Sequence, residues 1–302
     1  MPISSFYKFL NFLFFDKCNN SQFIHKKEKG EKGDILRKTE STSRIWLIQE
    51  SLHQIWVWYH SNPALRLKPL YALLNETKWD VEYRGYSMNL IHNHISEILE
   101  NSADALHFNY VHSSFKGLNL IKYFYEVTWK KAEDPKLFEH FKHKDDFQDK
   151  NRKKLISTHI TKENSKYMQV NGLESYFTIP ALGFKYHFLT GTALHLGSNL
   201  IYYNFNSWFY DVLFIMTALP LSEYEQKFTV TVFTNKKMPF FVSAPLIYGE
   251  MLQMTNDGEI WDQKINPKRI YYNKFGVYDR MFIEWRNFYA QFMETQPQEE
   301  EK

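Results

Sequence analysis

The chain has 302 residues, with 37 lysines and arginines against 34 aspartates and glutamates, and a single cysteine, Cys18. This length fits one large domain or two modest ones, each able to bury a core. A net charge of +3 over such a length gives no reason to expect nucleic-acid binding, which usually needs a concentrated basic surface. One cysteine excludes an internal disulfide and a four-cysteine zinc site, so a metal here would use histidine and carboxylate ligands.

The first 43 residues differ from the rest of the chain. Residues 25–38 hold six lysines or arginines and three acidic residues with two glycines, so we expect residues 1–43 to form a flexible segment. The apolar stretch 6–15 is interrupted by Lys8 and Asn11. It falls short of the roughly 18 apolar residues that a membrane-spanning helix needs, so we expect no such helix in this chain.

Alternating and aromatic residues begin at Arg44. The pattern of residues 45–60 predicts two short strands around a turn, and another short strand is predicted over 80–86. Between residues 91 and 110, apolar side chains recur at three- and four-residue steps, which predicts a helix.

The second half of the chain reads as a run of strands followed by two helices. The predicted helices cover 239–254 and 278–292, and 131–154 and the tail 294–302 are predicted to be solvated. The lengths suit a curved antiparallel sheet of about six strands. The predicted strands of this half are 119–130, 156–179, 185–196, 200–209, 212–218 and 227–233.

The segment from Glu100 to His112, ENSADALHFNYVH, carries the candidate chemistry. Iron(II) oxygenases hold their metal with two imidazoles and one carboxylate, and the other metal face stays open. On an ideal helix a five-residue step turns the side chain by about 140°, so His107 and His112 can share a metal only if the helix ends or bulges between them. We therefore predict a helix end or a π-bulge there.

Chance can also explain this spacing, because the chain has twelve histidines. His92 and His94 form a competing pair, but positions two apart on a helix point in different directions, so we expect them at the surface. A zinc-protease motif, a phosphate-binding glycine loop and a nucleophile elbow are all missing from the sequence.

The pattern E-N-x-x-D-x-x-H-F-x-x-x-H resembles the mononuclear-iron motif of Rieske-type oxygenases, and most closely the steroid branch of cholesterol 7-desaturases and 3-ketosteroid 9α-hydroxylases. Two further segments match in the right order. IWVWYH at 55–60 resembles the strand that closes the Rieske domain, and DGEIW at 257–261 resembles the D-x-x-I-W motif. The resemblance covers residues 45 to 292. It implies a remnant of a Rieske domain at 44–62 and a catalytic domain at 63–293.

This resemblance implies that His107, His112 and Asp257 bind iron. It also implies that Asp104 helps electrons to cross from the cluster of a neighbouring subunit. Taken from the sequence alone, Asp257 lies in Asn-Asp-Gly, a strong turn signal, and Asp104 reads equally well as a helix-capping acid. Glu259 is the alternative carboxylate.

Glu100 and Asn101 are expected to orient the ligands through hydrogen bonds rather than to bind iron. The fold that we predict is α+β, a helix-grip domain of the START and Bet v 1 type, in which a curved antiparallel sheet wraps a long helix. An apolar space between the two would suit a sterol.

The sequence departs from the family pattern in its cysteine count. A Rieske [2Fe–2S] cluster takes two cysteines and two histidines, whereas this chain has only Cys18. Three explanations stay open: a fragment of a working enzyme, an inactive paralogue, or a chain that takes electrons from another subunit.

The activity that the resemblance implies is conversion of cholesterol to 7-dehydrocholesterol. It would use mononuclear Fe(II), O2 and electrons from NAD(P)H that pass through a reductase. The resemblance also implies a trimer that works at the endoplasmic reticulum membrane. The alternatives are a steroid hydroxylase of the same family and a sterol- or lipid-binding protein without a metal.

Overall fold

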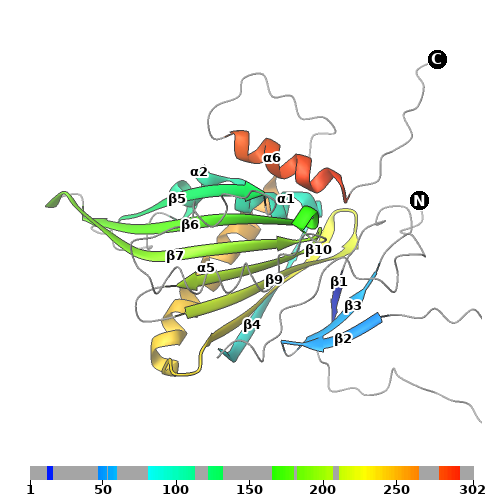
Figure 1. Cartoon of the computed structure of the whole chain (residues 1–302), viewed down its shortest axis with the longest axis horizontal. Coiled ribbons are helices and arrows are strands. Elements are labelled where there is room, and N and C mark those ends of the chain that lie inside the picture. The colour runs from blue at the N-terminus through cyan, green and yellow to red at the C-terminus, as the bar shows by residue number, and fades with distance from the viewer. Residues whose placement is uncertain are drawn as a thin grey trace, which may run out of the picture.

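A curved antiparallel sheet forms the body of the protein (Figure 1). The computed structural model describes residues 12–15, 47–52, 54–59, 81–112, 122–131, 165–179, 182–206, 211–264 and 279–292. Within these ranges seven strands pair in the order β4-β10-β9-β8-β7-β6-β5. Their bounds are β4 Val81–Ile91, β5 Lys122–Lys131, β6 Met168–Ile179, β7 Phe184–Leu196, β8 Leu200–Asn206, β9 Asp211–Ser222 and β10 Glu225–Asn235.

Four α-helices of the described ranges accompany this sheet: α1 Ile95–Glu100, α2 Ala105–Val111, α5 Phe240–Gln263 and α6 Asp279–Ala290. A 3-10 turn, η4 Asn101–Ala103, separates α1 from α2, and a second, η5 Ser165–Tyr167, precedes β6. Figure 1 shows α5 running behind the sheet, with α6 above it. The α+β, helix-grip prediction is therefore confirmed.

Each strand of the sheet sends alternate side chains to its two sides. On β8, Tyr203 belongs to the core under the helices, whereas Tyr202 belongs to a second core on the opposite side. On β9, Phe214 and Leu213 divide in the same way. The period of two follows from the pleat of a strand, and continuously apolar strands indicate that both sides of this sheet are covered.

A small second sheet covers the opposite side. It contains β1 Phe12–Phe15, β2 Leu47–Ser51 and β3 Gln54–Trp58 in the order β1-β3-β2. Trp56 and Trp58 are fully buried against the large sheet, and the Gln54 amide hydrogen-bonds the Thr231 hydroxyl of β10. The two short strands predicted around a turn are confirmed, whereas β1 lies in a segment that we expected to be flexible.

Other predictions fall outside the described residues. They concern the remaining residues of 1–43, including Cys18, the segment predicted to be solvated beyond Lys131, and the tail 294–302. No helix in the described part of the chain combines the length and the apolar character needed to cross a membrane.

Two local predictions were wrong. Within the described ranges the sheet has seven strands where about six were predicted, because the short strand predicted at 80–86 continues to Ile91 and forms one edge. The helix predicted over 91–110 is not continuous, since its first residue belongs to β4 and the helical residues after it are divided among α1, η4 and α2. The helix predicted over 278–292 is confirmed as α6.

We predict that Trp56→Ala lowers the free energy of unfolding by about 3–5 kcal/mol, as expected when a buried aromatic is truncated. The side chain is fully buried, and its Nε1 donates to the Ser51 carbonyl at 3.0 Å. Urea unfolding would measure the loss. The exposed Ile48→Ala on the neighbouring strand serves as the control, with an expected change within about 0.5 kcal/mol. Equal effects would contradict a stabilising role for the buried Trp56 side chain.

Candidate metal centre

Two capping side chains divide the segment after β4 into short helices. The His94 ring accepts from the Ser96 amide at 3.2 Å and starts α1. Asp104 starts α2, because its Oδ1 accepts from the amides of Leu106 and His107 at 3.1 and 3.0 Å. Such caps satisfy the donors left free at a helix start, and they explain why this apolar-periodic segment is not one helix.

The two candidate histidine ligands lie at opposite ends of α2. His107 lies in its first turn, and His112 is the C-cap, with φ −106° and ψ 6°. The helix has ended at Val111, so His112 is free of the helical rotation and can face His107. The predicted helix end between them is confirmed.

The candidate carboxylate comes from the other end of the sequence. Asp257 lies inside α5, so its Asn-Asp-Gly context is not a turn, and the alternative interpretation from local sequence was wrong. Gly258 is there for packing: a Cβ at this position would lie 3.2 Å from the Ile91 Cδ1 atom. The glycine thus lets α5 approach the end of β4 closely.

Three donor atoms converge between α2 and α5. The Nε2 atoms of His107 and His112 are 2.9 Å apart, and Asp257 Oδ1 lies 3.5 and 3.2 Å from them. Ligands that bind a metal at about 2.1 Å on one face of an octahedron are roughly 3 Å apart. The triad therefore fits an iron site. Within the described ranges it is the one group of three histidine, cysteine or acidic side chains close enough together to hold a metal ion.

The polar neighbours orient these ligands. In the tautomer in which His107 Nδ1 donates to the Asp104 carbonyl at 3.1 Å, Nε2 keeps its lone pair toward the site. Asn101 Nδ2 donates to Asp257 Oδ2 at 3.1 Å and lies 3.0 Å from His107 Nε2. Because Oδ2 is engaged in this way, Oδ1 is the oxygen that faces the two histidines.

Burial and charge act in opposite directions on Asp257. Its side chain is 1% exposed, and this burial raises the pKa of the carboxyl. Hydrogen bonds and charge from His107 and His112 outweigh burial, so the pKa lies below its usual range. The carboxylate is thus ionised at neutral pH, which is the form that binds a cation.

The competing candidates do not join the triad. Glu259 is exposed on α5, and the exposed His92 lies 3.6 Å from Asp262. His94 caps α1 rather than facing the site. Asp104 acts as the capping acid that the local sequence allowed.

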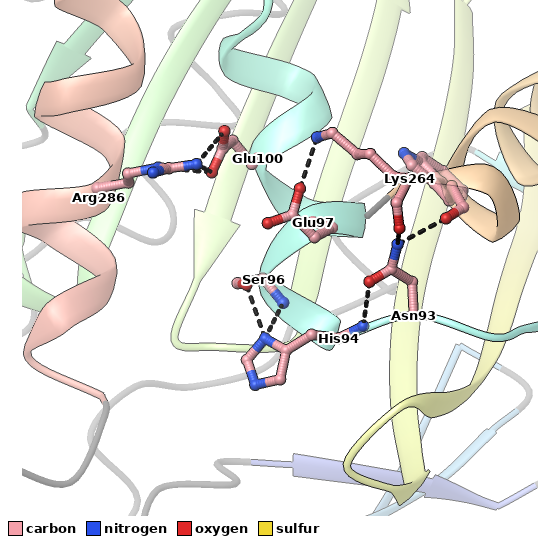
Figure 2. Close-up of polar contacts among 8 residues, drawn as sticks. Asn93, His94, Ser96, Glu97, Glu100, Lys264 and Arg286 are labelled. Carbon is pink, nitrogen blue, oxygen red and sulfur yellow. Dashed lines mark hydrogen bonds and ion pairs between the residues drawn. The ribbon is translucent and has the colours of Figure 1, made fainter. Parts of the chain in front are cut away.

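Ion pairs hold α1 against the other helices (Figure 2). Arg286 of α6 donates two hydrogen bonds of 2.8 Å to the Glu100 carboxylate. Lys264, just after α5, lies 2.6 Å from Glu97, and Asn93 donates to the carbonyls of Trp261 and Lys264 at 2.6 and 3.0 Å. Burial raises the pKa of Glu100, and the charge of Arg286 opposes that shift.

The sheet holds the 3-10 turn from the other side. Asn171 of β6 donates to the Ser102 carbonyl at 2.8 Å, and His195 Nε2 of β7 lies 2.9 Å from the Ser102 hydroxyl. Burial lowers the pKa of His195 to about 3, so this ring is neutral. Sequence analysis missed these residues and Arg286, because nothing local distinguishes them from other polar residues of a strand or helix.

A curved sheet wrapped on a helix, with two histidines and one aspartate converging beside it, defines the catalytic domain of a Rieske oxygenase. Residues 55–293 match the family described as the 3-ketosteroid 9α-hydroxylase C-terminal domain. The chain belongs to this family.

Its curated relatives include several cholesterol 7-desaturases. That of Hemicentrotus pulcherrimus is 22% identical over 276 residues, which cover 88% of this chain and 51% of the relative. That of Drosophila melanogaster is 24% identical over 258 residues, covering 83% and 55%. The chain thus spans about half the length of the curated relatives that it matches.

Solved structures show a more distant likeness. Pseudomonas putida CBB5 NdmB is 11% identical, covers 80% of this chain and 58% of its own, and has a TM-score of 0.48. Dicamba monooxygenase bound to dicamba is 10% identical, covers 82% and 69%, and has a TM-score of 0.47.

We predict that His195→Gln flattens the acid dependence of stability. The folded chain keeps His195 neutral down to about pH 3, whereas the unfolded chain takes up a proton near pH 6.5. Below about pH 6.5 the wild type should therefore lose about 1.4 kcal/mol per pH unit through this group, and the variant should not. Urea unfolding between pH 5 and 8 measures both slopes, and equal slopes would contradict a buried neutral ring.

Proposed function

We propose that this chain is the iron-binding catalytic part of a sterol oxidoreductase that converts cholesterol to 7-dehydrocholesterol. The observation that carries the proposal is the convergence of His107, His112 and Asp257 within 4.8 Å of one another. The relatives named as cholesterol 7-desaturases supply the substrate class.

The donor set suits ferrous iron. Two imidazoles and one carboxylate are the set used by iron(II) enzymes that activate dioxygen, and such an iron, when bound, supplies the oxidising power that breaks an aliphatic C–H bond. The chain's own contribution is to hold the ligands. Asn101 fixes the Asp257 carboxylate, and the Asp104 carbonyl fixes the His107 ring. We assign these orienting roles to Asn101 and, through its link to α6, to Glu100.

The overall reaction balances with one reductant. Cholesterol loses two hydrogens as a double bond forms between carbons 7 and 8, and NAD(P)H supplies two further electrons. These four electrons and the accompanying protons reduce one O2 to two molecules of water.

Electrons must come from a cluster that these 302 residues do not provide, because they contain one cysteine and a Rieske [2Fe–2S] cluster needs two. We propose that a cluster carried elsewhere delivers them, with Asp104 on the path, fed by a reductase. A trimer is the arrangement proposed for this transfer. Because cholesterol resides in bilayers, we propose that the enzyme works at a membrane.

Hydroxylation of a 3-ketosteroid is the second candidate. The matching family is named for a 9α-hydroxylase, and hydroxylation begins with the same hydrogen removal. The two reactions differ in whether the product gains an oxygen or loses two hydrogens. A sterol carrier without a metal would give no reason for three metal-ligand side chains, two of them buried, to converge.

We predict that the purified chain binds about one Fe(II), measured anaerobically by metal analysis and titration. His107→Ala, His112→Ala and Asp257→Ala should each weaken binding by more than about a hundredfold, and Asn101→Ala by about 10- to 100-fold. The exposed His92→Ala is the matched control and should bind iron normally. Unchanged iron in His107→Ala would refute the site.

A second prediction concerns turnover of cholesterol. With NAD(P)H and a reductase alone, the chain should release no 7-dehydrocholesterol, because it lacks a place to store the electron. Addition of a protein that carries a Rieske cluster should allow 7-dehydrocholesterol to form, which mass spectrometry would detect. Product formed without that addition would refute our account of the electron supply, and a product heavier by one oxygen would favour the hydroxylase.

A further inference from the structure

We propose that Arg286 is a positioning residue of the metal centre, acting through Glu100 and Asn101 without touching a ligand. The inference rests on the proposed function, since it concerns the same iron site. It assigns to the C-terminal helix α6 a role in setting the geometry of a centre whose ligands all lie on other helices.

The contact between Arg286 and Glu100 fixes a carboxylate in both place and orientation. Two parallel hydrogen bonds of 2.8 Å join the guanidinium to the two carboxylate oxygens. Such a two-point contact fixes the orientation of the carboxylate relative to the guanidinium. The Glu100 side chain is 5% exposed, so water cannot easily replace its partner. Figure 2 shows the two side chains meeting between α1 and α6.

The backbone of Arg286 is held in place by the packing of α6. Neighbouring residues of α6, Trp285, Phe288 and Tyr289, belong to the buried core under the sheet. The helix packs against both α1 and the turn η4. The Arg286 backbone is thus tied to the core, and its side chain transmits that position to the end of α1.

Glu100 is joined directly to Asn101, the residue that touches two of the three ligands. On the far side of the turn, Ser102 is held by Asn171 and His195 of the sheet. Asn101 therefore lies between two anchored neighbours. Release of the Glu100 anchor leaves the turn held on one side only, so the Asn101 amide and the Asp257 carboxylate that it orients can rotate.

A second ion pair on the same helix provides an internal comparison. Lys264 lies 2.6 Å from Glu97, one turn before Glu100. Among the described residues, Glu97 is not adjacent in sequence to one that contacts a ligand, whereas Glu100 precedes Asn101. A lysine makes a one-point rather than a two-point contact. If ion pairs matter here only for stability, loss of either pair should have the same consequence at the metal.

The experiment compares Arg286→Met with Lys264→Met in the full chain. Each is loaded with Co(II), whose visible spectrum reports ligand geometry, and is titrated anaerobically with Fe(II). We expect Arg286→Met to shift the cobalt bands and to weaken Fe(II) binding by about 10-fold or more, the usual size for a residue behind the ligands. Lys264→Met should change affinity less than about twofold and leave the bands in place. Arg286→Lys should behave like Arg286→Met.

The double variant Glu100→Met with Arg286→Met separates position from stability. Replacing a buried ion pair by apolar side chains removes the uncompensated charge that destabilises the single variant, so thermal stability should recover. The cobalt spectrum should stay shifted, because the two-point contact is still missing.

The outcomes identify which proposal fails. If the wild type binds neither Co(II) nor Fe(II), the proposed function fails. If the wild type binds both metals but Arg286→Met matches Lys264→Met in spectrum and affinity, Arg286 is structural only. Recovery of the wild-type spectrum in the double Met variant would likewise overturn the positioning role.

Discussion

The angular step of the α-helix is the constraint on which this site depends. Two histidines five residues apart point in different directions on a regular helix, so they can share a metal only where the helix stops. The chain meets this condition with α2, which begins at the Asp104 cap and ends before His112. The end of α2 just before His112 is therefore what the site requires.

The large sheet supplies the rigid reference for these short elements. Helices of six and seven residues have little stability of their own, and they are held here by side chains from longer elements. Asn171 and His195 reach the turn from the sheet, and α5 contributes the third candidate ligand, Asp257. The positions of the candidate ligands therefore depend on the 24-residue helix α5 and on the seven described strands of the large sheet.

Much of this arrangement could be predicted from sequence, and the exceptions share one cause. Strands such as β8 and β9 were predictable because a short, continuously apolar run is typical of a strand that is buried on both sides. The helix end near His112 followed from geometry. The extension of β4 and the helical state of Asp257 were missed, because they depend on tertiary contacts such as the approach of Gly258 to Ile91. Arg286 carries no local signal at all.

The fold and the proposed electron path place chemically distinct requirements on the Asp104 carboxylate. Both amides at the start of α2 bond to the same oxygen, Oδ1, and any acceptor of similar reach would satisfy them. The fold therefore needs only a hydrogen-bond acceptor at position 104. The proposed passage of an electron would instead use the negative charge of the side chain. One aspartate can meet both requirements.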